Sequence, residues 1–62
     1  MPFIHVEFLE GKTLEQKREI AKAITDAMVK IGGVNPEAVY VIFNDLSKSN
    51  LAKAGQLFVD KE

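Results

Sequence analysis

Apolar and polar residues alternate along residues 2–9 in the way that is typical of a β-strand. One face of this strand is uniformly apolar, and the other is mixed. The apolar face comprises Pro2, Ile4, Val6 and Phe8, and the mixed face comprises Phe3, His5, Glu7 and Leu9. The pattern predicts that a continuous cover packs on the first face. The second face, with His5 as a surface or interface residue without a catalytic role, is free to meet a neighbouring subunit.

After the strand, apolar residues recur with the spacing of an α-helix. Glu10-Gly11 is typical of a tight turn, and Thr13 and Gln16 have the spacing of a capping box. Apolar residues then recur three and four positions apart as far as Ile31, with polar residues mostly around the other side. Gly32-Gly33 supplies a stop, because a glycine readily adopts the left-handed conformation of a helix cap. The pattern predicts a helix over residues 14–31.

A second strand is predicted over residues 38–44, which are rich in β-branched and aromatic side chains. A turn over residues 34–37, with Asn35 as a possible cap, precedes it, and a polar loop over residues 45–50 follows it. Residues 51–59 predict a hairpin or arm, with a short strand at 57–59. Strand, helix and strand in this order predict an α/β fold. It is a βαβ unit with a parallel two-stranded sheet, one long helix, a right-handed crossover and a C-terminal hairpin or arm.

The chain is too short to cover this sheet on both faces. Its 62 residues predict a single domain over residues 1–62, and a domain of this size buries only a modest fraction of its surface. It has no cysteine and one histidine, which excludes disulfides and disfavours a zinc site within one chain. Parallel sheets are normally covered on both faces. We therefore expect the sheet to continue into another subunit and residues 51–59 to lie against a neighbour.

The composition of the chain argues against two classes of partner, nucleic acids and membranes. The hydrophobic fraction of 47% is that of an ordinary globular protein, and the net charge of −1 offers no basic face for nucleic acid. The apolar runs are too short to span a bilayer, and no signal peptide is recognisable. These features predict a cytoplasmic protein without a nucleic-acid or membrane partner.

Pro2 is the candidate for unusual chemistry. Initiator methionine is usually removed before a small residue, and removal of Met1 would leave Pro2 as a free secondary amine. Burial in an apolar pocket and a nearby positive charge would lower the pKa of such an amine toward neutrality, where it works as a general base. If Met1 stays attached, Pro2 is a tertiary amide without basicity. Taken alone, Pro2 is more often just the first residue of an edge strand.

The whole pattern resembles the 4-oxalocrotonate tautomerase family. Residues 8–13, FLEGKT, are similar to the family's LEGR(S/T) turn, and residues 15–17, EQK, match its helix start. The strand over 39–45 and the Ala54-Gly55 pair complete a likeness that covers essentially the whole chain. The resemblance implies an isomerase in which Pro2, as general base and acid, moves a proton between oxygen and carbon of a 2-hydroxydienoate. It also implies no cofactor, no metal, a small enol or keto carboxylate as substrate, and a homohexamer built as a trimer of dimers, with sites that cross subunit boundaries.

The resemblance assigns substrate-binding roles to Lys12, Tyr40 and Leu51. Lys12 occupies the place of an arginine that holds a substrate carboxylate, and its alternative is a solvated lysine in a turn. Tyr40 replaces a second arginine, and its alternative is an aromatic residue packed at an interface. Leu51 replaces an aromatic wall residue, and Lys53 is a candidate to restore a cation. These departures indicate a different or smaller substrate, or weak activity on the family's standard one. Apolar walls for Pro2 are expected from Phe3, Phe43 and Leu51.

Two other functions fit the same residues. Pro2 could act as a nucleophile that forms an iminium with an aldehyde or ketone, which borohydride trapping would detect. Alternatively, the chain could be a non-catalytic oligomeric interaction protein on the same fold, and native protein that retains Met1 would favour this function.

Overall fold

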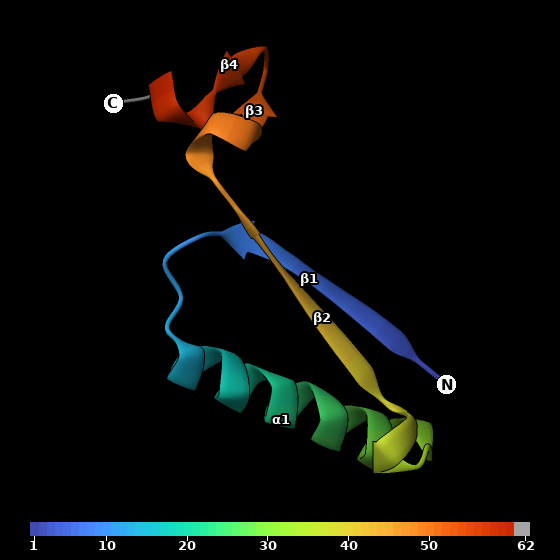
Figure 1. Ribbon diagram of the computed structural model, residues 1–62. Coiled ribbons are helices and arrows are strands. Elements are labelled where there is room, and N and C mark those ends of the chain that lie inside the picture. The colour runs from blue at the N-terminus through green and yellow to red at the C-terminus, as the bar shows by residue number, and fades with distance from the viewer. Residues whose placement is uncertain (61–62) are drawn as a thin grey trace.

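The fold is a βαβ unit with a small arm at its C-terminal end (Figure 1). The computed structural model describes residues 1–60, so Lys61 and Glu62 of the predicted domain lie outside the described residues. Strands β1 (Phe3–Leu9) and β2 (Tyr40–Leu46) form a parallel sheet, and helix α1 (Leu14–Gly32) returns the chain between them. The predicted α/β class, parallel pairing and single long helix are confirmed.

The register pairs the two strands along their full lengths, from Phe3 opposite Tyr40 to Leu9 opposite Leu46. The second strand begins two residues later than predicted, because Asn35 starts a 3₁₀ turn (Pro36–Ala38) that includes Ala38. The Asn35 side chain accepts a hydrogen bond from the Glu37 N–H at 2.9 Å, which confirms Asn35 as a cap. The same strand also continues through Leu46, so the prediction that Asp45 begins a loop was wrong.

The C-terminal arm is a hairpin between β3 (Ala52–Lys53) and β4 (Gln56–Leu57), as predicted in outline. Short 3₁₀ turns over Lys48–Asn50 and Phe58–Asp60 flank it, so the predicted strand at 57–59 is shorter and earlier than expected. The Phe58 N–H donates to the Leu51 carbonyl at 2.8 Å and closes the arm on itself. The arm projects beyond the end of the sheet (Figure 1).

Both ends of α1 are fixed by their caps. The Thr13 hydroxyl accepts from the Gln16 N–H at 3.1 Å, and the Gln16 side chain accepts from the Thr13 N–H at 2.9 Å, so the capping box is confirmed. Gly33 ends the helix in the left-handed conformation with φ 68°, and its N–H donates to the Val29 carbonyl. No helix among residues 1–60 is long and apolar enough to cross a membrane.

The helix covers only one face of the sheet. Ile4, Val6, Val41 and Phe43 lie half-buried on that face. The opposite face, which we call the open face, exposes apolar residues that include Phe3 (56% exposed), Tyr40 (42%) and Ile42 (42%). Consequently, none of residues 1–60 is fully buried in a single chain.

The chain is also less compact than a self-sufficient domain. Its radius of gyration is 14.9 Å, whereas a compact domain of this length would have about 11 Å. Its extents of 43 × 23 × 14 Å describe a thin, elongated unit. A single copy therefore consists of one helix packed on one face of the sheet, and the open face of the sheet has no cover among residues 1–60.

Candidate active site

Pro2 lies at the N-terminal end of β1, directly beside the start of β2. The Tyr40 N–H donates to the Pro2 carbonyl at 3.0 Å, which fixes the backbone that carries the proline ring. The rings of Phe3 and Tyr40 stack on the open face, with centroids 4.9 Å apart and planes 11° from parallel. Pro2 itself is half-buried. The sheet thus holds Pro2 firmly at one end of the molecule, and Tyr40 is the predicted site residue next to it.

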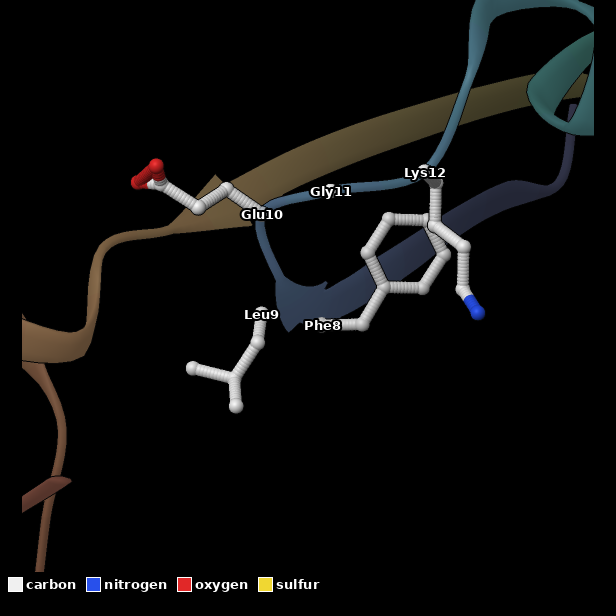
Figure 2. Close-up of a pocket in the computed structure, with 5 residues that line it drawn as sticks. All are labelled: Phe8, Leu9, Glu10, Gly11 and Lys12. Carbon is white, nitrogen blue, oxygen red and sulfur yellow. The ribbon is translucent and has the colours of Figure 1, made fainter. Parts of the chain in front are cut away.

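Lys12 lies at the other end of the sheet, in the turn that leaves β1. A pocket of about 460 Å³ is lined there by the consecutive residues from Phe8 to Lys12. Figure 2 shows the lysine side chain alongside the Phe8 ring, and its Nζ is 6.0 Å from the ring centroid. That distance is the outer limit of a cation–π contact. The ammonium group therefore has an aromatic neighbour and an open side toward the pocket.

The length of β1 separates these two groups. A strand rises by about 3.3 Å per residue, so the seven residues of β1 place Pro2 and Lys12 roughly 20 Å apart. Leu51 follows β2 at the Lys12 end, and Lys53 is exposed in the arm beyond it. One chain therefore brings Pro2 together with Tyr40, and Lys12 to the same end as Leu51, but it does not bring the two pairs together.

The expected apolar walls of Pro2 are divided in the same way. Phe3 lies on the open face, whereas Phe43 lies on the face covered by α1, where its ring stacks on Phe8 with centroids 6.0 Å apart. Leu51 lies beyond the far end of β2. Within one chain these three side chains therefore do not surround Pro2.

An ion pair that the sequence did not suggest lies beside the Lys12 pocket. Lys17, at the end of the first turn of α1, pairs with Asp45 near the end of β2. Asp45 is the register partner of Phe8 and shares its face of the sheet. The sequence does contain a signal for it. Side chains two residues apart on a strand share a face, so Asp45 falls on the same face as Phe43 once the strand is extended.

Similarity to known proteins covers almost the entire chain. The family model described as tautomerase enzyme matches residues 2–61. The chain belongs to the tautomerase family. It is therefore an isomerase with tautomerase activity, as the resemblance of its turn and helix-start motifs predicted.

Individual relatives agree with this assignment. The tautomerase is 47% identical over 57 residues to a probable tautomerase of Lactococcus lactis, covering 92% of this chain and 93% of the relative. It is 36% identical over 62 residues to the 2-hydroxymuconate tautomerase of Bacillus subtilis, with both chains fully covered. The crystal structure of a 4-oxalocrotonate tautomerase homologue superposes with a TM-score of 0.93 at 35% identity, covering 100% of this chain and 98% of that one.

Proposed function

We propose that this tautomerase moves a proton between oxygen and carbon of a 2-hydroxydienoate or a related enol or keto acid, with Pro2 as the general base and acid. The observation that carries the proposal is the end-to-end similarity to a 2-hydroxymuconate tautomerase, combined with a proline at position 2. Removal of Met1 converts the Pro2 nitrogen from an amide into a secondary amine with a lone pair. That amine accepts the hydroxyl proton of the enol as the carbonyl forms, and it returns a proton to carbon.

The backbone around Pro2 suits this role. The hydrogen bond from the Tyr40 N–H restrains the Pro2 carbonyl, and the proline ring fixes rotation about its N–Cα bond. A proton carrier that is fixed in place loses little entropy when it meets the substrate. Pairing of the strand therefore suits the proposed role, since it holds the residue that carries the amine in one place.

Lys12 supplies the positive charge that a carboxylate substrate requires. Its ammonium lies at the pocket beside Phe8, where a planar conjugated acid can lie against the ring while its carboxylate meets Nζ. We assign Tyr40 a neutral hydrogen bond to the substrate through its hydroxyl. Leu51 contributes an apolar wall at the Lys12 end.

Because Pro2 and Lys12 are roughly 20 Å apart in one chain, we propose that each site combines residues of different copies. The exposed apolar side chains of the open face and the absence of any fully buried residue among residues 1–60 support self-association. A hexamer built as a trimer of dimers is the assembly that we propose, and the C-terminal arm is suited to reach a neighbouring copy.

The test of the proposed base is replacement of Pro2. We expect Pro2→Ala to lower kcat for 2-hydroxymuconate or phenylenolpyruvate by at least about 100-fold, because alanine leaves a terminal amine without the rigid ring. Intact mass spectrometry should first confirm that each preparation lacks Met1. The oligomer should persist in sedimentation, since the Pro2 side chain contributes little to the sheet.

Pro36 provides the matched control, since it is the other proline of the chain and lies in the turn before β2. We expect Pro36→Ala to keep wild-type kcat. Equal turnover by Pro2→Ala and wild type would refute the role of Pro2. A borohydride-stable adduct on Pro2 during turnover would instead indicate the iminium mechanism.

A further inference from the structure

Three charged side chains lie around Phe8, although binding of one substrate carboxylate requires only one positive charge. Lys12 lies over the ring of Phe8, and Asp45 is the neighbour of Phe8 across the ladder. Lys17 reaches the same place from α1 and pairs with Asp45. The capping box and the hydrogen bond from the Lys17 N–H to the Thr13 carbonyl, at 3.1 Å, fix the turn of helix from which Lys17 extends.

This ion pair is the most enclosed one in the described part of the chain. The Lys17 and Asp45 side chains are 23% and 37% exposed, whereas the Lys22–Asp26 pair on α1 is 79% and 64% exposed. Among residues 1–60, no carboxylate lies within ion-pair distance of Lys12. Figure 2 shows that the carboxylate of Glu10 points away from the Lys12 ammonium. Lys12 is thus left unpaired beside a carboxylate that another lysine holds.

Asp45 would compete for Lys12 if Lys17 were absent. Paired strands lie about 4.8 Å apart, so the backbone of Asp45 lies one strand spacing from that of Phe8, whose ring has the Lys12 ammonium as a neighbour. A lysine has a flexible four-carbon stem, and its ammonium readily turns toward a neighbouring anion. A carboxylate on the protein would then occupy the cation that the substrate needs.

We propose that Lys17 holds Asp45 in an ion pair so that the Lys12 ammonium stays free for the substrate carboxylate. Lys17 is then a positioning residue that touches no substrate, and it acts by removing a competitor. This proposal rests on the proposed role of Lys12 as the carboxylate-binding cation. It differs from a purely structural role of the ion pair, because only loss of the lysine liberates a negative charge.

The decisive experiment compares the two ways of breaking the same pair. We expect Lys17→Met to raise KM for 2-hydroxymuconate about three- to fivefold with little change in kcat, because the freed Asp45 competes for Lys12. Asp45→Asn should leave KM unchanged or lower it, and the double variant should follow Asp45→Asn. High salt should shrink the effect of Lys17→Met, since it screens the competing charge.

Lys22→Met is the matched control, because it breaks a lysine–aspartate pair on the same helix away from the pocket, and its KM should stay at the wild-type value. Sedimentation should confirm the same assembly for every variant, and Lys17→Gln replaces Lys17→Met if methionine disturbs it. Equal increases of KM in Lys17→Met and Asp45→Asn would overturn the proposal in favour of a structural pair. An increase that persists in the double variant would overturn it in favour of direct contact between Lys17 and the substrate.

Failure of the proposed function would look different. If Lys12→Met leaves KM unchanged, Lys12 does not bind the substrate carboxylate, whatever Lys17 does. If 2-hydroxymuconate is not turned over, the dissociation constant of cinnamate, a stable planar carboxylate, can be measured by NMR titration on the same variants. The proposal then predicts the same asymmetry in binding, and identical dissociation constants for Lys17→Met and Asp45→Asn would refute it.

Discussion

At the scale of single residues, Tyr40 illustrates how one position serves the strand and the site through different atoms. Its backbone N–H holds the Pro2 carbonyl, and its ring stacks on Phe3. Its hydroxyl belongs to neither contact and is the group that can reach a substrate. A strand aromatic and a substrate-binding residue are therefore compatible descriptions of Tyr40.

Removal of this hydroxyl separates the two roles. Tyr40→Phe keeps the ring stack and the backbone hydrogen bond, so we expect the free energy of unfolding to change by less than about 0.5 kcal/mol. We expect kcat/KM to fall about fivefold, which corresponds to the loss of one neutral hydrogen bond. Steady-state kinetics and denaturant titration measure the two effects. Unchanged kinetics would mean that Tyr40 only packs.

At the scale of elements, α1 is defined by its two ends more than by its interior. The capping box at Thr13 begins the helix and the left-handed Gly33 ends it, so that it runs from the Lys12 turn toward the start of β2. The two glycines at its C-terminal end differ in conformation, because only Gly33 has a positive φ. Of these two adjacent glycines, therefore, only Gly33 occupies a backbone conformation that favours glycine.

These two glycines give a prediction with a built-in control. We expect Gly33→Ala to lower the free energy of unfolding by about 1 kcal/mol, because its φ of 68° is strained for an L-residue. Gly32→Ala should instead raise it by about 0.5–1 kcal/mol, since Gly32 is helical and an added Cβ would meet only the Met28 Cε at 3.8 Å. Thermal or denaturant unfolding at one fixed protein concentration measures both changes. Effects of the same sign would contradict the assignment of the cap.

At the scale of the whole molecule, the main feature is the exposed apolar surface of the open face. A sheet with Phe3, Tyr40 and Ile42 exposed on the side away from α1 lacks a cover in one copy. The radius of gyration of 14.9 Å is also large for a chain of this length, because the unit is thin and elongated. Both features are those of a subunit whose second apolar layer comes from its neighbours.

A charge on the open face should therefore break the assembly. We expect Ile42→Glu to shift the protein to smaller species in sedimentation and to abolish turnover, because an unpaired charge would be buried between copies. Lys22→Glu adds negative charge on the outer side of α1, where the side chain at that position is mostly exposed, and should leave the assembly intact. An Ile42→Glu protein that sediments like wild type would exclude the open face as an interface.

Local signals made most of this fold predictable from the sequence. Alternation gave β1, the 3.6-residue period and two caps gave α1, and the Asn35–Pro36 pair marked the turn before β2. The start of β2 was misplaced because the turn extends one residue further, through Ala38. The end of β2 was misplaced separately, because the polar residues from Asp45 onward are typical of a loop, and this error concealed the ion pair between Asp45 and Lys17.

The candidate site was less predictable than the fold. Motif similarity suggested Pro2, Lys12, Tyr40 and Leu51 as candidate site residues, yet their positions in space depend on the length and direction of β1. A sequence motif carries no information on which copy supplies each residue, because the contacts between copies are set by surfaces and not by spacing along the chain.

The separation of Pro2 and Lys12 by the length of β1 has a consequence for evolution. If each site combines Pro2 of one copy with Lys12 of another, as we propose, one daughter chain could lose its proline end after gene duplication and the other its lysine end. A mixed assembly would then still contain intact sites. Each chain would then be free to adapt its idle end to regulation or to a new ligand. A seven-residue strand thus makes division of labour between paralogues accessible through single substitutions.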